Sequence, residues 1–389
     1  MQEPPSGPEP PSQGPFEKEP EPEQPHPSPP EWTAPPVYPS FLDAARQGRH
    51  SAGRYLLGIL FVFFFSQFFS IGPALVLAWI FAPRGTTPGE LQGMLADPGR
   101  FGPLPGFLFV NIISLFLLLG VMLAVLALHR RPPISLITGA RRVSMRRILQ
   151  GFGVWMGLAI LASAVDYAMV PESYTFQFDA RLFFPFLLLA LVLTPLQTTG
   201  EELFFRGYVV QGFSLVTRRR LILSMVSGVF FMVPHFANPE MEPNPFIAAL
   251  AYFVIGFALA FVSLRDGTLE LAIGAHFANN LFSWIIVNYE GSVLPTPSLF
   301  FTSSFDPHGT LIGLLISTTI FYGIFFPPWK RRPPASGAFQ RVDASAPPSA
   351  AQDSDASRLP AAPGETDRSR PLPASSIANR LAFDPNDGE

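Results

Sequence analysis

Long uninterrupted apolar runs dominate the middle of the chain, between about residues 46 and 332. A membrane-crossing helix needs about 20 mainly apolar residues. Eight runs reach or approach this length, and their continuity favours helices over the alternating pattern of a membrane β-barrel. The predicted spans are 55–81, 107–128, 152–170, 182–216, 221–237, 246–264, 271–288 and 309–326. The pattern predicts an all-α polytopic membrane protein with eight transmembrane helices in one domain, 46–332.

Two polar segments flank this domain. The first, 1–45, has 15 Pro and seven Glu among its first 40 residues, and the second, 333–389, has nine Pro among many Ala, Ser and Asp. Such segments bury too little apolar surface to offset chain entropy, so the sequence predicts disordered tails that act as solvated spacers. A docking site for a partner domain is the alternative role. The first 40 residues lack the cationic start and apolar segment of a signal peptide.

Positive charges are distributed unevenly between the loops that join the predicted spans. With eight spans, sixteen Arg and Lys residues fall on the side of the two tails and three on the opposite side. Cytoplasmic loops carry such an excess of Arg and Lys. We therefore expect an integral membrane protein, in the plasma membrane, with both termini in the cytoplasm. No internal repeat is visible, which weakens an inverted-repeat transporter as an alternative.

Composition excludes several other classes of protein. Only 14% of the 389 residues are charged, whereas soluble domains carry about 25%. The net charge of −3 and the lack of a basic domain exclude a protein that binds nucleic acid through a basic surface. The absence of Cys excludes disulfides, thiolate metal sites and a cysteine nucleophile.

Ionisable residues inside the predicted spans are the strongest indication of function. Such residues are costly in hydrocarbon, usually face the bundle interior and mark functional sites by default. A buried ion pair with two hydrogen-bonded histidines is the structural alternative. Asp166 lies near the outer end of its span, where we expect it to reach the interface rather than enter a site. The six residues are Asp166, Glu201, Glu202, Arg206, His235 and His276.

The fourth span contains two adjacent glutamates and an arginine. Glu202 and Arg206 are four residues apart with Glu first, the favourable order for an ion pair on a helix. Glu201 lies about 100° away around an α-helix and is not paired with Arg206 in the same direct way. Glu202 is thus predicted to have a structural partner, while Glu201 is left to act as a general base.

The fifth span ends with a histidine next to a proline. Phe231 lies one turn before His235 on the same face of a helix. Pro234 should loosen the local hydrogen bonds and could aim His235 inward. Taken alone, a histidine on an apolar helix is more often simply hydrogen-bonded.

The seventh span supplies a second histidine and an amide. His276 and Asn280 are four residues apart and share a face, whereas Asn279 lies about 100° away and is the weaker candidate. Asn280 can donate a hydrogen bond to an oxyanion or orient His276. A carboxylate, two imidazoles and an amide on three spans suit hydrolysis, which needs a base for water and donors for the oxyanion.

The three motifs together resemble those of the CPBP intramembrane proteases, also called the Abi or type II CAAX prenyl protease family. They are Glu201-Glu202-x-x-x-Arg206, Phe231-x-x-x-His235 and His276-x-x-x-Asn280, within 198–281. The resemblance covers about 150–326, and the tails have no counterpart in the family core. It implies an eight-helix fold with a cavity open toward the cytoplasm, and hydrolysis of a peptide bond.

The resemblance also implies a role for each motif residue. Glu201 and His235 would activate water, His276 and Asn280 would stabilise the oxyanion, and Glu202 and Arg206 would shape the site. If the site holds a metal, Zn²⁺ would be bound by Glu201, His235 and His276 with water as the fourth ligand. No His-Glu-x-x-His motif is present, so a glutamate/histidine mechanism is favoured over a metalloprotease.

Two functions of different classes follow. The first is an intramembrane endopeptidase that cleaves a membrane-associated protein or peptide, either a prenylated CAAX protein or a bacteriocin-like precursor. The second is a non-catalytic membrane immunity or assembly factor of the same fold. A transporter or a lipid-modifying enzyme is a more distant alternative. Rhomboid-type Gly-x-Ser-Gly and presenilin-type Gly-x-Gly-Asp motifs are absent from the spans. The lipid bilayer is the expected environment, and no nucleic-acid partner is expected.

Overall fold

The computed structural model describes residues 40–242, 244–303 and 306–327, all within one unit, Met1–Arg331. The predicted tail 333–389 and most of 1–45 lie outside the described residues. Residues 40–45 are described, and there Phe41, Ala44 and Ala45 are buried. They pack against the helices, so residues 40–45 belong to the folded part of the chain.

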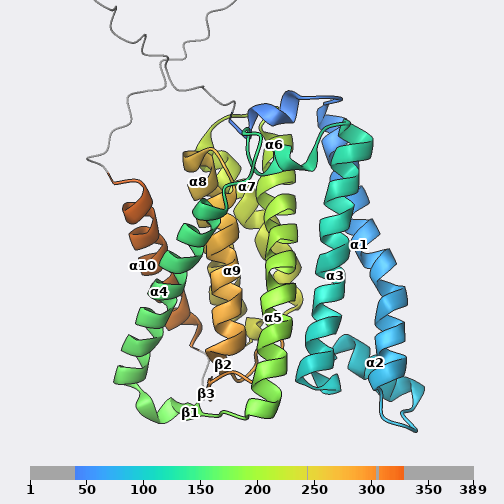
Figure 1. Cartoon of the computed structure of the whole chain (residues 1–389), viewed down its shortest axis with the longest axis vertical. Helices are drawn as coiled ribbons and strands as arrows, with labels where there is room; N and C mark the ends of the chain where they lie inside the picture. Colours follow the sequence, from blue (N-terminus) through green and yellow to red (C-terminus); the bar gives the residue numbers. More distant parts are fainter. Residues whose placement is uncertain (1–39, 243, 304–305, 328–389) are drawn as a thin grey trace, which may run out of the picture. The chain divides into compact units, whose positions relative to one another are not determined.

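Helices make up most of the described chain (Figure 1). Short 3₁₀ and π segments, labelled η, extend or join the α-helices. The elements are η1 (Asp43–Arg46), α1 (Ala52–Phe81), α2 (Pro88–Ala96), η2 (Pro98–Phe101), α3 (Pro103–Leu123), η3 (Ala124–His129), η4 (Pro133–Leu136), α4 (Met145–Met169), η5 (Pro171–Ser173), β1 (Tyr174–Phe176), α5 (Ala180–Glu201), η6 (Glu202–Val209), α6 (Val210–Phe213), α7 (Arg220–Met232), η7 (Val233–Ala237), η8 (Pro239–Met241), α8 (Pro245–Asp266), α9 (Glu270–Ile285), β2 (Val287–Tyr289), β3 (Phe300–Thr302) and α10 (Pro307–Phe325).

Seven helices among the described residues are long and apolar enough to cross a membrane. Large apolar side chains point outward from them, as Phe68 and the 85% exposed Trp79 do on α1. Because such side chains belong in hydrocarbon rather than water, the chain is an all-α polytopic membrane protein. The seven are 52–81, 103–129, 145–169, 180–213, 220–237, 245–266 and 307–325. They correspond to seven of the eight predicted spans, with ends that differ by several residues.

The seventh predicted span, 271–288, differs from the prediction. Its helix, α9, has 16 residues and is therefore about 24 Å long, shorter than the roughly 30 Å hydrocarbon core. It ends at Ile285, and the chain continues into strand β2. The end of the predicted span is therefore wrong, and the count of eight spans stays a prediction.

Helix α9 is nevertheless the helix that organises the centre of the bundle. It packs against α4, α5 and α8, and Figure 1 shows it between α4 and α5. Glycines allow the close approach of α4 and α9. A Cβ on Gly151 would lie 2.3 Å from the Leu271 carbonyl oxygen, and one on Gly274 would lie 2.0 Å from the Ile148 carbonyl oxygen. Small residues that let backbones approach are typical of helix contacts in membranes.

A small sheet connects the loops at one end of the bundle. Its order is β1-β3-β2, with β1 antiparallel to β3 and β2 parallel to it. Tyr174 pairs with Thr302, and Val287 pairs with Phe300. The sheet lies at the opposite end of the bundle from η1 and α6 (Figure 1). Strand pairing joins segments far apart in the sequence, so the apolar pattern alone did not predict it.

Candidate active site

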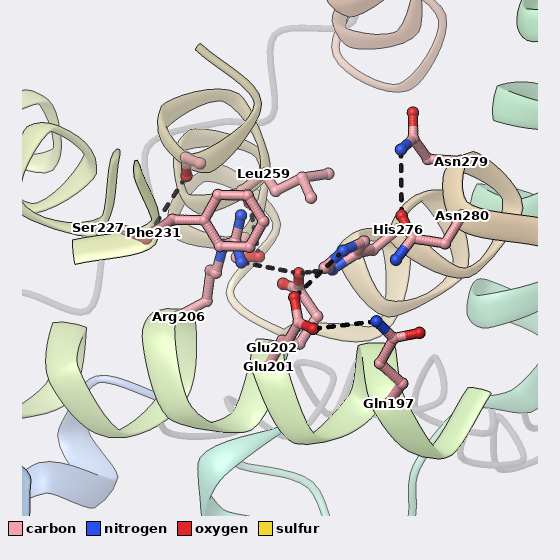
Figure 2. A network of polar contacts seen from close by, with 12 residues as sticks. Gln197, Glu201, Glu202, Arg206, Ser227, Phe231, Leu259, His276, Asn279 and Asn280 are labelled. Atoms are coloured by element: carbon pink, nitrogen blue, oxygen red, sulfur yellow. Dashed lines mark hydrogen bonds and ion pairs between the residues drawn. The ribbon is translucent and has the colours of Figure 1, made fainter. Parts of the chain in front are cut away.

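The predicted catalytic residues lie on segments that meet inside the helix bundle. Glu201 ends α5, and Glu202 and Arg206 lie on η6. His276 and Asn280 lie on α9, while His235 lies on η7. Figure 2 shows the first five of these side chains near one another, together with residues that the motifs do not include.

The Glu202–Arg206 ion pair forms on a π-helical segment rather than on the predicted α-helix. The Arg206 Nη1 atom lies 3.1 Å from Glu202 Oε1, and both side chains are fully buried. The guanidinium also lies over the Phe231 ring, 4.2 Å from its centroid. The wider turns of η6 are of the kind often found at functional sites. The predicted pairing is thus present, although the helix geometry differs.

His276 lies between the two glutamates. Its Nδ1 atom is 2.7 Å from Glu202 Oε1, and its Nε2 atom is 3.6 Å from Glu201 Oε2. An ionised carboxylate only accepts hydrogen bonds, so the Nδ1–H group donates to Glu202. One Glu202 oxygen therefore contacts both His276 and Arg206. The sequence predicted that these residues belong to one site. It did not predict that the two glutamates contact opposite nitrogens of the His276 ring.

Glu201 is the less enclosed of the two carboxylates. Its side chain is 14% exposed, whereas that of Glu202 is 0% exposed. Gln197, four residues earlier, donates a hydrogen bond of 3.4 Å from Nε2 to Glu201 Oε1. Gln197 belongs to none of the three motifs, although its spacing of four residues from Glu201 was a signal for it. Glu201 Oε2 remains directed toward His276.

His235 is linked to the other site residues by its contact with the Phe231 ring. Proline at position 234 cannot continue the α-helix, which ends at Met232 and changes to the 3₁₀ segment η7. The Nδ1 atom of His235 is 2.6 Å from the Phe231 carbonyl oxygen. The Phe231 ring lies 4.6 Å from the His235 ring and 5.7 Å from the His276 ring. Phe231 therefore contacts both imidazoles of the motifs.

Tyr252 is a second partner of His235 that the motifs do not contain. Its ring stacks on the imidazole at 4.2 Å, and its hydroxyl accepts a hydrogen bond of 3.1 Å from Asn238. Tyr252 lies on α8, between two predicted motifs. Because His235 donates from Nδ1 to a carbonyl, its Nε2 atom is a free acceptor in the neutral ring.

Asn280 bonds a neighbouring amide instead of His276. Its Oδ1 atom accepts a hydrogen bond of 3.2 Å from Asn279 Nδ2, and Asn279 Oδ1 accepts one of 3.2 Å from Trp155 Nε1. Asn279, the weaker sequence candidate, thus connects Asn280 to α4. Trp155 carries no signal in the sequence because the contact joins helices 124 residues apart.

Comparison with known proteins identifies the family. Residues 180–282 match the family model of the type II CAAX prenyl endopeptidases, Rce1-like. The chain belongs to this family. Its matched segment contains all three motifs. The chain is 36% identical over 235 residues to the uncharacterized protein YyaK of Bacillus subtilis (strain 168), an alignment that spans 60% of this chain and 77% of the relative. No solved structure matches the chain significantly.

The residues suggested for zinc do not form a ready metal site. Among residues 40–242, 244–303 and 306–327, no three His, Asp or Glu side chains are grouped so that they could hold a metal ion. Glu201 and His276 face each other at 3.6 Å, and the Nδ1 atom of His235 is taken up by the Phe231 carbonyl oxygen, which leaves only its Nε2 atom available to bind a metal ion. The donor set does not fit a preformed tetrahedral site, and we derive no step through a metal.

Asp166 lies apart from the central residues, as predicted. It is exposed near the end of α4 and accepts a hydrogen bond of 2.5 Å from the Tyr174 hydroxyl. Burial, together with this hydrogen bond, raises the pKa of Tyr174 in strand β1. Asp166 therefore links the α4 end to the sheet.

Proposed function

We propose that this protein is an intramembrane endopeptidase, which hydrolyses a peptide bond of a membrane-associated protein or peptide. One observation carries the proposal: His276 is bracketed by Glu201 and Glu202, all inside a membrane bundle. Buried carboxylates repel each other and are costly in hydrocarbon, so a purely structural element would not need this arrangement. The family to which the chain belongs supports the same chemistry.

The first step of the proposed reaction is activation of water. Glu201 takes a proton from water as the general base, and the neutral His235 Nε2 atom accepts a hydrogen bond from the same water. The hydroxide oxygen then bonds to the peptide carbonyl carbon, and the carbonyl oxygen becomes an oxyanion. Gln197 holds the Glu201 carboxylate in position through its hydrogen bond.

The second step is collapse of the tetrahedral intermediate. His276 Nε2–H and the Asn280 amide donate to the oxyanion, a role that requires His276 in its imidazolium form. With His276 positive, the formal charges of Glu201, Glu202, Arg206 and His276 sum to zero. The C–N bond breaks, and the leaving amine takes the proton held by Glu201.

The expected orientation and partners complete the proposal. The excess of Arg and Lys on one side favours an orientation with both termini in the cytoplasm. The substrate is a protein or peptide whose cleaved bond lies at the membrane, with a prenylated CAAX segment as the family's example. The two tails are proposed to act as spacers. The alternative is that a tail is a docking site for a partner domain.

The test compares the termini of membrane proteins in cells that express the wild type or Glu201→Ala. We expect the variant to insert normally and to lose the cleaved termini, because it lacks the base that activates water. Asp166→Asn is the matched control, since Asp166 is a span carboxylate outside the site. Unchanged termini with Glu201→Ala would instead favour the non-catalytic immunity or assembly factor. Cleavage by the purified wild type should also persist after exhaustive chelation, checked by elemental analysis.

A further inference from the structure

Trp155 occupies an unusual position relative to the candidate site. It lies on α4, outside the segment 180–282 that matches the family model, and only 4% of it is exposed. Its indole donates to Asn279, which in turn donates to Asn280. The close packing of α4 on α9 at Gly151 and Gly274 brings the two helices near enough for this contact.

The chemistry of these three side chains fixes the direction of each hydrogen bond. An indole N–H can only donate, so Asn279 must turn its Oδ1 atom toward Trp155. Its Nδ2 group then faces Asn280 and donates to Asn280 Oδ1. Asn280 is left with its Nδ2 donor on the side away from Asn279, as Figure 2 shows. A single donor on α4 therefore decides which end of the Asn280 amide is available.

This orientation matters for the reaction. An oxyanion needs a donor, and an Asn280 amide turned the other way would present its Oδ1 atom and repel the developing charge. We propose that Trp155 is a positioning residue that, through Asn279, holds Asn280 with its N–H donor toward the substrate carbonyl. The inference rests on the proposed function, because only an oxyanion gives the orientation a catalytic consequence.

Asn279→Asp is the decisive variant because it is nearly isosteric. The new carboxylate still accepts from Trp155, but it can no longer donate, so it draws the Asn280 Nδ2 group toward itself. We expect a cleavage rate about 10²-fold lower, comparable to the loss of one oxyanion donor in Asn280→Ala. A merely structural role for Asn279 predicts little change from this substitution. Full activity of Asn279→Asp would overturn the proposal.

Trp155→Phe and Asn279→Leu remove hydrogen bonds that fix the orientation of the Asn280 amide, but they do not favour the opposite orientation. We expect losses of only about twofold to tenfold, because Asn280 then samples both orientations, and an orientational preference of 1.4 kcal/mol corresponds to tenfold. In an Asn280→Ala background none of these substitutions should slow cleavage further. A further loss from Asn279→Asp in that background would mean that its charge acts directly, and the proposal would fall.

The probe is a quenched fluorescent peptide ending in a farnesylated CAAX segment, added to the full chain in lipid nanodiscs. A second measurement needs no substrate: the indole N–H resonance of Trp155, assigned by its loss in Trp155→Phe. It should shift upfield and exchange faster in Asn279→Leu but not in Asn279→Asp. An unchanged resonance in Asn279→Leu would refute the contact. Activity that survives Glu201→Ala would reject the proposed function while leaving this result intact.

Discussion

Two buried polar clusters in this protein contain similar residues but have different properties. The central cluster consists of Glu201, Glu202, Arg206 and His276. The anchor cluster consists of Tyr55, His129, Arg131, Tyr208 and Gln211, and lies where α1, η3 and α6 meet. Each has one arginine and one histidine that are almost fully buried. The difference lies in how their polar atoms are satisfied.

The polar groups of the anchor cluster are nearly all satisfied, and its acceptors are neutral. Arg131 donates to the Ala44 carbonyl at 2.8 Å and to Gln211 at 2.6 Å. His129 bonds the Arg49 carbonyl through Nδ1 and the Tyr208 hydroxyl through Nε2. Since a carbonyl only accepts, the His129 ring is satisfied in its neutral form. This cluster secures the first described residues to the bundle.

The central cluster depends on charge instead. Both nitrogens of His276 face carboxylates. Within the described part of the chain, Glu202 Oε2 and the three Arg206 guanidinium nitrogens lack a hydrogen-bond partner of good geometry. Such groups are costly when buried, and they are the groups able to respond when a substrate brings new charge. The proposed reactive centre therefore differs from the anchor cluster, where among the described residues only Arg131 Nε lacks a partner, in how many of its buried polar atoms are unsatisfied rather than in burial alone.

The two histidines provide the largest contrast. His276→Ala should lower the cleavage rate by about 10²–10³-fold, because an oxyanion donor is removed. His129→Ala should leave the rate per folded molecule unchanged and lower the thermal unfolding midpoint, because the Tyr208 and Arg49 groups lose their partner. Cleavage rates and unfolding midpoints on the same purified samples check both. Equal losses of cleavage in the two variants would contradict the distinction.

The two arginines test the same distinction through stability. Arg206→Met leaves the buried Glu202 without its guanidinium partner and with His276 alone, and we expect a loss of about 3–5 kcal/mol in the free energy of unfolding. Arg131→Met removes hydrogen bonds from neutral acceptors and should cost about 1–3 kcal/mol. Unfolding in mixed micelles with increasing SDS measures both. Adding Glu202→Gln to Arg206→Met should recover part of the loss, and no recovery would argue against the ion pair.

Glu240, which belongs to neither cluster, gives the smallest effect. It lies on η8 outside the spans, only 5% exposed, and accepts a hydrogen bond of 2.9 Å from the Val293 amide. Burial raises the pKa of Glu240 from its ordinary value of 4.5. Because the folded state favours the protonated form, this stabilisation is complete below that value and is lost as pH rises through the folded-state pKa.

Glu240→Gln should therefore flatten the decrease in stability as pH rises above 4.5. The measurement is the unfolding midpoint of both proteins across a pH series. A variant with the same slope as the wild type would show that another group titrates. Burial of the Glu240 carboxylate would then make no measurable contribution to the pH dependence of stability.

Local properties of the sequence determined the helices and the identity of the motif residues. Apolar run length predicts spans such as 55–81 because the bilayer requires a fixed length of apolar helix, wherever the other helices lie. The spacing of Glu202 and Arg206 predicted their ion pair, because neighbours four residues apart on a helix meet without help from other segments. The cost of charge in hydrocarbon singled out Glu201 and His276.

Only the tertiary structure decided what surrounds these residues. Packing of α9 against α5 puts the Glu201 and Glu202 carboxylates on opposite nitrogens of His276, and packing against α4 puts Trp155 beside Asn279. The tertiary structure also decided the short length of α9 and the pairing of β1 with β3. These features depend on contacts between distant segments, and a one-dimensional pattern carries no direct record of which helix faces which. The sequence by itself therefore determined which residues are available for chemistry, and the fold determined their hydrogen-bond partners and orientation.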